Sequence, residues 1–200
     1  QGPPGTGKTV TALEIICNWL RLGRGPVLAT AFSNVGVDNL AEGLQARKIN
    51  VVRVGVLGRG LECSFERRFG SEGKHLSECI DLVRSFDVVC ATCIGTGMSV
   101  LNPSEFSMDF PYVVVDEAAQ VIEPAVLLPL AKGSCQVALV GDHHQLPATV
   151  LSDEAEAKGL GVSLLARLAA AGCEVQMLDM QYRMHPAIAS FPSLEFYSGR

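Results

Sequence analysis

The sequence predicts an α/β fold built on a mainly parallel sheet with helices on both faces. Short apolar runs alternate with segments whose apolar residues recur at helical spacing along nearly the whole chain. Such runs are typical of strands buried on both faces, and their alternation with helices implies right-handed crossovers. Since 48% of the 200 residues are hydrophobic and 18% are charged, the chain can bury a substantial core.

The periodic segments give the expected elements in chain order. Helical spacing predicts helices at 8–22, 35–46, 75–85, 118–131 and 162–171. Short apolar runs predict strands at 26–31, 50–56, 87–92, 112–115, 136–140 and 174–178. Residues 57–86 interrupt this alternation with glycine and charge, as at Gly58, Arg59 and Gly60. We expect a small insertion or inserted subdomain there; a solvated loop is the alternative.

A glycine-rich motif opens the chain. Residues 2–9 read GPPGTGKT, which matches the phosphate-binding pattern G-x-x-x-x-G-K-S/T, and a periodic helix follows at once. Such a loop wraps a phosphate chain with backbone N–H groups at the positive end of a helix, so a P-loop NTPase is expected. Lys8 would reach the β- and γ-phosphates of ATP, and the Thr9 hydroxyl would hold Mg²⁺. The expected nucleotide-binding residues of the loop are Gly2, Pro3, Gly5, Thr6, Gly7, Lys8 and Thr9.

Two later strand ends carry the polar groups that hydrolysis needs. The run at 112–115 ends in Asp116 and Glu117, which we expect near Mg²⁺ and near the attacking water, respectively. The run at 137–140 leads into GDHHQLP, where Gln145 is placed to sense a terminal phosphate. Loops at the carboxyl ends of parallel strands converge on the ligand, so these groups should meet the phosphate loop.

The cysteines and histidines do not favour a metal centre. Cys90 and Cys93 have C-x-x-C spacing, but no second pair with ligand spacing exists. His143 and His144 are adjacent, and adjacent histidines rarely share one ion. Seven scattered cysteines favour reduced thiols in an intracellular protein, cytoplasmic or nuclear. The net charge of −5 says little about a nucleic-acid groove, and no apolar run is long enough to span a membrane.

The four motifs taken together resemble one family. GPPGTGKT, DEAAQ at 116–120, GDHHQLPAT at 141–149 and QYRMHP at 181–186 look like the superfamily 1 helicases of the regulator-of-nonsense-transcripts and senataxin-like branch. The resemblance spans nearly the whole chain and implies the first RecA-like domain of an ATP-dependent translocase. It implies movement on single-stranded RNA or DNA, 5′-to-3′, without choosing between the two nucleic acids.

The resemblance assigns further residues to the nucleotide. It implies that Gln145 and Arg183 contact the γ-phosphate and that Tyr182 stacks on the adenine. Judged from the residues alone, Tyr182 would be a core tyrosine and Arg183 a surface arginine.

The resemblance also implies contacts to nucleic acid. Ser33 and Asn34, in the stretch TAFSNVGVDNL, and Thr92, in CATCIGTG, would hold backbone phosphates without reading bases. Judged alone, Ser33 and Asn34 form a helix cap and Thr92 ends a strand.

The resemblance implies that residues 1–200 are one part of a motor. A strand should precede the phosphate loop, and a second RecA-like domain, which supplies another arginine, should follow. We therefore expect these 200 residues alone to be poorly stable and nearly inactive. Three alternatives stay open: another P-loop class, although no N/T-K-x-D guanine motif is present; an inert binding module; and a parent protein with a nuclease or zinc domain elsewhere.

Overall fold

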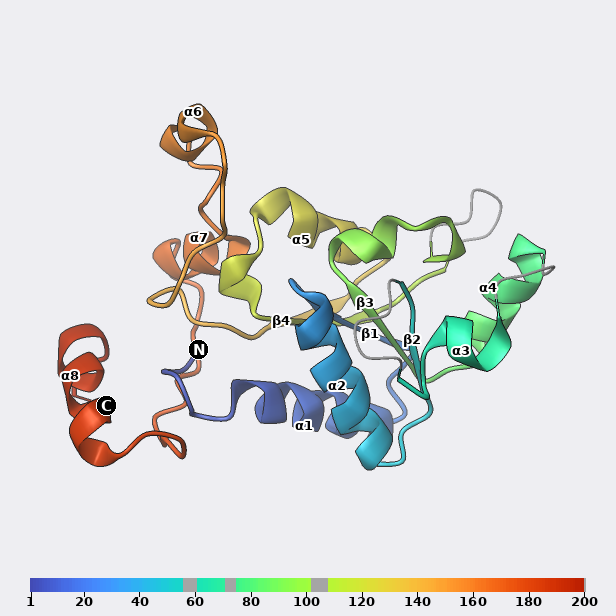
Figure 1. The fold of residues 1–200 in the computed structure, drawn as a ribbon, viewed down its shortest axis with the longest axis horizontal. Coiled ribbons are helices and arrows are strands. Elements are labelled where there is room, and N and C mark those ends of the chain that lie inside the picture. The colour runs from blue at the N-terminus through green and yellow to red at the C-terminus, as the bar shows by residue number, and fades with distance from the viewer. Residues whose placement is uncertain (56–60, 71–74, 102–107, 200) are drawn as a thin grey trace.

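The computed structural model describes residues 1–55, 61–70, 75–101 and 108–199, and its centre is a parallel sheet (Figure 1). The strands are β1 (Val27–Ala31), β2 (Val51–Arg53), β3 (Val88–Thr92), β4 (Tyr112–Asp116) and β5 (Gln136–Leu139). Their order is β2-β3-β1-β4-β5, and every neighbouring pair is parallel. The predicted α/β fold with a parallel sheet is confirmed.

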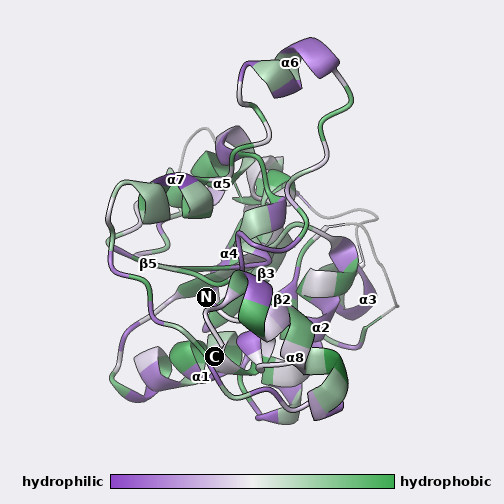
Figure 2. Ribbon diagram, turned by 90° about the vertical axis from the view of Figure 1, so that its left-hand side faces the viewer, coloured by the Kyte–Doolittle hydropathy of each residue, from purple (hydrophilic) through white to green (hydrophobic). Residues whose placement is uncertain are grey.

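Most predicted helices are present with nearly the expected bounds. The helices are α1 (Lys8–Arg21), α2 (Asn34–Ala46), α3 (Phe65–Phe69), α4 (Leu76–Arg84), α5 (Glu123–Leu130), α6 (Asp153–Ala157), α7 (Leu164–Ala170) and α8 (Pro186–Phe196). The predicted helix at 118–131 is divided into a 3₁₀ turn (Ala118–Gln120) and α5, whose first turn holds a proline. The prediction omitted α3, α6 and α8, and α6 projects from the body in both views (Figures 1 and 2).

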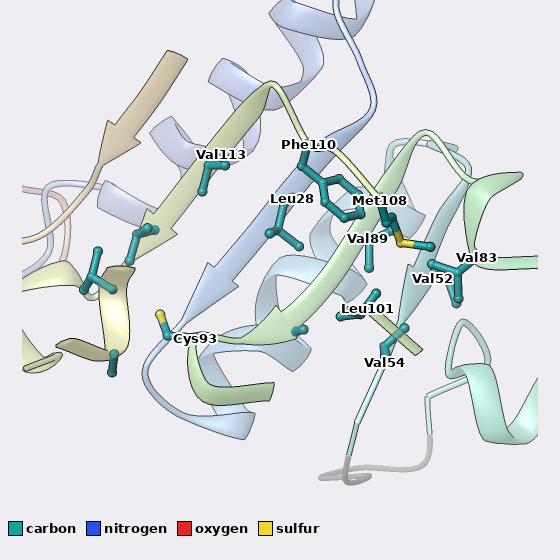
Figure 3. Packing of buried hydrophobic residues seen from close by; sticks show 14 of the residues in the cluster. Leu28, Val52, Val54, Val83, Val89, Cys93, Leu101, Met108, Phe110 and Val113 are labelled. Carbon is teal, nitrogen blue, oxygen red and sulfur yellow. The ribbon is translucent and has the colours of Figure 1, made fainter. Parts of the chain in front are cut away.

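Helices cover both faces of the sheet because successive strand residues point to opposite sides. Val27 and Ala29 pack with α1 and α2, whereas Leu28 packs with α4, α5 and α7. Figure 3 shows this second cluster, in which Leu28 lies among side chains of the neighbouring strands and Phe110. Burial on both faces explains why the strand runs are apolar without alternation.

The described part of residues 57–86 packs on the sheet beside β2. Phe65 of α3 and Ile80 and Val83 of α4 join the core cluster that contains Val52. This part is therefore ordered against the core, unlike the solvated loop that was the alternative. Whether it forms a subdomain of its own stays a prediction, and Gly58, Arg59 and Gly60 lie outside the described residues.

The predicted strand at 174–178 is wrong. The segment has no strand beside it in the described ranges; its backbone bonds instead to Gln1, which donates to the Gln176 carbonyl at 2.7 Å and accepts from the Leu178 N–H at 2.8 Å. The sheet ends at β5, where Val137 is 39% exposed. A groove of about 420 Å³ separates β5 from residues 174–178, with α1 and α7 at its sides.

None of the described helices is both long and apolar enough to cross a bilayer.

A buried ion pair ties α2 to β2. Arg53 Nε donates to Asp38 Oδ1 at 3.1 Å, and both side chains are 1% exposed. The other guanidinium nitrogens donate to the Val54 carbonyl at 2.6 Å and to Asn34 Oδ1 at 2.7 Å. Burial of a charge is tolerated only with such partners, so Arg53 fixes the first turn of α2 against the sheet.

Arg53→Ala is expected to lower the free energy of unfolding by about 3–5 kcal/mol, because it leaves the Asp38 carboxylate buried without its cation. Urea denaturation followed by circular dichroism measures the change. The matched control is Lys158→Ala, which breaks the ion pair with Glu154 between side chains that are 73% and 79% exposed. That control should change stability by less than about 0.5 kcal/mol. Equal effects of the two substitutions would contradict the role given to Arg53.

Candidate functional site

The phosphate loop is shaped by glycines and by its own side chains. Gly5 and Gly7 have φ values of 83° and 81°, which only glycine adopts without strain. The Thr6 hydroxyl donates to the Pro3 carbonyl at 2.8 Å, and Lys8 Nζ donates to the carbonyls of Gly2 and Pro3 at 2.8 and 3.2 Å. The loop curls around the Lys8 ammonium group, and burial lowers the pKa of that group despite the nearby charges of Asp142 and Asp116.

The first acidic residue meets the loop directly. Asp116, at the end of β4, is 3% exposed, and its Oδ2 accepts from the Thr9 hydroxyl at 2.8 Å. Burial raises the pKa of the Asp116 carboxyl, although the hydrogen bonds from Thr9 and the Glu117 N–H act in the opposite direction. A hydroxyl and a carboxylate from distant parts of the chain therefore share one point, as a site for a hard cation requires.

The second acidic residue turns away from the strand. Glu117 has a left-handed φ of 56°, and its Oε2 accepts from the Ser33 hydroxyl at 3.3 Å. Burial raises the pKa of the Glu117 carboxyl, the charge of Asp116 raises it further, and the Ser33 hydrogen bond opposes both. The carboxylate thus lies between the phosphate loop and the first turn of α2.

One cavity collects all the residues predicted to be catalytic. It has a volume of about 290 Å³ and lies at the carboxyl ends of β4 and β5. Its lining includes Lys8, Thr9, Asp116, Glu117, Gln145 and Arg183. These six residues supply two cations, two carboxylates, a hydroxyl and an amide, and Asp142 adds a third carboxylate to the lining. Such a set can bind a polyphosphate and a divalent cation at once.

Asp142, to which no role was assigned from the sequence, organises the loop that carries Gln145. It is 2% exposed, and Oδ2 accepts from Gln145 Nε2 at 2.7 Å and from the Tyr197 hydroxyl at 2.6 Å. Its Oδ1 accepts from Gln1 Nε2 at 3.0 Å and from the His144 N–H at 3.1 Å. Gln145 Nε2 also donates to the Gly2 carbonyl at 3.2 Å, so Asp142 and Gly2 together hold the Gln145 amide against the phosphate loop.

Burial alone would raise the pKa of the Asp142 carboxyl. The hydrogen bonds from Tyr197, Gln145, His144 and Gln1 outweigh burial and hold this pKa below its ordinary value. The position of Asp142 directly after the β5 run was the one signal in the sequence that could have identified it.

The QYRMHP segment lies beside the phosphate loop. The Tyr182 N–H donates to the Gly5 carbonyl at 2.9 Å, and a Cβ at Gly5 would come within 2.6 Å of the Arg183 Cβ. Tyr182 is 78% exposed, so it is a surface tyrosine and not a core one. A second, open cavity of about 870 Å³ lies between Tyr182, Arg183 and the loop residues Gly5 to Gly7.

The residues predicted to bind nucleic acid lie along the same sheet edge. In the parallel register Ala31 pairs with Thr92 on one side and with Asp116 on the other. Ser33 caps α2 by accepting from the Gly36 N–H at 3.0 Å, and Thr92 accepts from the Gly95 N–H at 2.9 Å. The helix cap inferred from the residues alone is therefore present at Ser33, and the inferred strand end is present at Thr92, whereas Asn34 accepts from Arg53 and does not cap the helix. Ser33 also reaches the cavity through Glu117.

The cysteines and histidines are not assembled with acidic groups into a metal cluster within the described ranges. Cys90 and Cys93 are buried at and just beyond β3, and burial raises the pKa of the Cys93 thiol to about 11. The rings of His143 and His144 are in contact at a tilt of 39°, with their centroids 4.2 Å apart.

Comparison with known proteins places these motifs among helicases. Two models of the AAA domain match, one over residues 1–77 and 64–153 and the other over residues 160–200. The chain is 36% identical to a regulator of nonsense transcripts 1 homolog of Arabidopsis thaliana and 34% identical to the ATP-dependent helicase NAM7 of Saccharomyces cerevisiae. Both alignments cover the whole chain, but only 18% and 23% of those proteins.

The fold is shared with more distant proteins. A crystal structure of Arterivirus nonstructural protein 10, a helicase, superposes with a TM-score of 0.58 at 16% identity, covering 98% of this chain and 38% of that one. The chain thus spans roughly a fifth of the length of the curated relatives named above.

Asp142→Asn is expected to lower the free energy of unfolding at pH 7 by about 1–3 kcal/mol, because four donors lose a carboxylate acceptor. The pKa of Asp142 is depressed in the folded state, so its contribution is present above the unfolded pKa and lost as pH falls through the folded one. The difference between variant and parent should therefore shrink when urea denaturation is repeated near pH 3. Asp153→Asn, at an exposed residue of α6, is the control, and a pH-independent difference would contradict the assignment.

Proposed function

The chain belongs to the AAA-domain family of superfamily 1 helicases, in the regulator-of-nonsense-transcripts branch, and on that premise we propose that it is the first motor domain of an ATP-dependent nucleic-acid translocase. The observation that carries the proposal is the shared cavity, where the phosphate loop and the acidic pair after β4 face each other. In the parent protein this domain would act inside the cell, in the cytoplasm or the nucleus.

The residues present fit ATP and Mg²⁺. The contact of 2.8 Å between the Thr9 hydroxyl and Asp116 Oδ2 brings together the hard oxygen ligands that Mg²⁺ prefers. Positive φ values at Gly5 and Gly7 let the loop backbone curl, as a phosphate-binding loop requires. Mg²⁺, when bound, would neutralise phosphate charge, and Thr9 and Asp116 would hold it.

The other residues would orient the reaction. Glu117 would accept a proton from the attacking water, and its raised pKa makes it a stronger base than an ordinary carboxylate. Gln145 would bind the γ-phosphate, while Lys8 and Arg183 would offset the charge that develops on its oxygens. These roles are supported by the common cavity and by the bonds that hold Gln145 to Gly2 and Asp142.

Tyr182 and a second RecA-like domain would complete the nucleotide site. The exposed Tyr182 ring beside the larger cavity suits stacking on adenine. The apolar residues Ile188, Phe191 and Leu194 of α8 are 65%, 70% and 73% exposed, which supports a partner domain against this side. ATP would close the cleft between the two domains, and hydrolysis would reopen it.

Single-stranded RNA or DNA would lie along the carboxyl edge of the sheet. Ser33 and Asn34 follow β1, and Thr92 is the last residue of the adjacent strand β3, so one backbone could touch all three. Contacts of this kind grip the strand without reading its sequence, as a translocating motor requires. Movement 5′-to-3′ belongs to the same proposal.

The groove beside β5 supports a further strand in the parent protein. An edge strand as exposed as β5 is unusual in a parallel sheet, because helices cover the faces of such sheets and exposed strand edges are usually protected. We propose that residues preceding Gln1 fill the groove between β5 and 174–178, continuing the pairing that Gln1 makes with Gln176 and Leu178.

A second class of function is an inert binding module on the same fold. The full set of cavity residues favours turnover, and the two hypotheses differ in one measurement, the hydrolysis of ATP by the full-length protein in a single turnover. A purely structural module would show none.

Lys8→Ala and Glu117→Gln are each expected to reduce ATP hydrolysis by the full-length protein at least ~100-fold, because one removes a phosphate ligand and the other the general base. Steady-state ATPase assays with and without single-stranded RNA or DNA measure the effect, and the more stimulating strand identifies the substrate. Only Lys8→Ala should also weaken nucleotide binding. Lys158→Ala, at the residue that follows exposed α6, is the control. Parental turnover in either site variant would contradict the site assignment.

Residues 1–200 alone are expected to bind nucleotide weakly and to hydrolyse it barely. The missing second-domain arginine would account for about 10³–10⁵ in rate. The open groove at β5 should also make this fragment unfold more easily than the same domain within the intact protein. Robust hydrolysis stimulated by a single strand, or reversible two-state melting at an ordinary mesophile temperature, would contradict these expectations.

A further inference from the structure

Ser33 stands between the two proposed ligands of this domain. Its hydroxyl donates to Glu117 Oε2 at 3.3 Å and accepts from the Gly36 N–H at 3.0 Å. It is also a residue proposed to hold a backbone phosphate of the single strand. One side chain therefore touches the proposed general base from the edge where the strand would bind.

The Glu117 carboxylate is closely confined by the first turn of α2. A Cβ on Gly36 would lie 2.9 Å from Glu117 Oε2, so the absence of a side chain there lets the carboxylate reach Ser33. The positive end of α2, a helix of 13 residues, also favours a negative charge at this place. Glu117 is thus held at the first turn of α2 by Ser33 while it also lines the cavity that contains Lys8 and Thr9.

A serine hydroxyl carries one proton and can donate it to one acceptor at a time. In this structure the acceptor is Glu117. A phosphate oxygen arriving at Ser33 would compete for the same proton, because an anionic phosphate is also a strong acceptor. Donation to the phosphate and donation to Glu117 therefore exclude each other.

We propose that Ser33 is a coupling residue: its hydroxyl restrains Glu117 until a single strand binds, and the strand's phosphate takes over that hydrogen bond and releases the carboxylate toward the attacking water. The inference rests on the proposed function, because it needs both a hydrolysable nucleotide in the cavity and a strand at the sheet edge. It gives a direct physical reason for nucleic acid to stimulate hydrolysis. No change in the sheet is needed, since Ser33 and Glu117 are already in contact.

The release has a geometric effect. Without the hydrogen bond from Ser33, the Glu117 side chain is free to rotate within the cavity that it lines. A carboxylate that can approach the attacking water can accept its proton.

Ser33→Ala in the full-length protein tests the proposal. Turnover of ATP without nucleic acid is expected to rise by about three- to tenfold, a part of the 10²–10⁴ that a positioned base supplies. Stimulation by a saturating homopolymeric single strand, of whichever nucleic acid stimulates the parent, is expected to fall by the same factor. Ser33→Thr, which keeps a hydroxyl, should restore the stimulation lost in Ser33→Ala.

Two further variants separate coupling from helix capping. Ser33→Gly also removes the hydroxyl but costs the cap only a few tenths of a kcal/mol, so it should match Ser33→Ala in turnover and remain folded. Ser152→Ala removes an equivalent cap from exposed α6, where the serine accepts from the Ala155 N–H at 3.3 Å. This control should leave both turnover and stimulation unchanged.

The outcomes distinguish this inference from the proposed function. If no single strand stimulates the parent, or if Glu117→Gln hydrolyses ATP at the parental rate, the proposed function fails. If the parent is stimulated and Glu117→Gln is inactive, but Ser33→Ala and Ser33→Gly keep parental turnover and stimulation, only the coupling role is overturned. A fall in unstimulated turnover in both Ser33 variants also overturns it, because Ser33 would then position the base and not restrain it.

Discussion

Ala31, at the end of the central strand, pairs with Thr92 on one side and Asp116 on the other, and this register determines where the nucleic-acid candidates and the acidic pair lie. Parallel strands that end level bring their following loops to one edge. The nucleic-acid candidates lie at or just beyond the ends of β1 and β3, and the acidic pair lies at the end of β4. A slip of one residue in either pairing would turn the strand's side chains to the opposite face and separate these groups.

The phosphate loop reaches this edge through α1. Thr9 and Asp116 are 107 positions apart, yet their side chains are in contact at 2.8 Å. The core between α1, α2 and the sheet, with Ile16 and Leu40 fully buried, makes that contact rigid. Packing of apolar residues far from the cavity therefore fixes the distance between the hydroxyl and the carboxylate.

Helices, strands and motifs whose signal lies in a short stretch of sequence were predicted correctly. Helical spacing gave α1 and α2, apolar runs gave the strands of the sheet, and the loop motif fixed the place of Lys8. The strand predicted at 174–178 was wrong because a strand is defined by its hydrogen-bonded neighbouring strand and not by its own composition. Asp142 and Arg53 were missed for a similar reason: their partners, such as Tyr197 and Asn34, come together only through the tertiary fold.

The backbone turn at the acidic pair also could not be predicted from local sequence, although Asp116 and Glu117 themselves were identified. In a continuing strand Asp116 and Glu117 would point to opposite faces, and only one could reach the cavity. The left-handed backbone at Glu117 ends the strand and turns the second carboxylate toward the same space. Such a conformation is costly for a residue with a side chain. It is held by the Glu117 N–H, which donates to Asp116 Oδ1 at 3.0 Å, and by the Ala118 N–H, which donates to the Val140 carbonyl at 2.9 Å. The neighbouring strand ends thus stabilise a strained turn that lets one carboxylate meet Thr9 and the other meet Ser33.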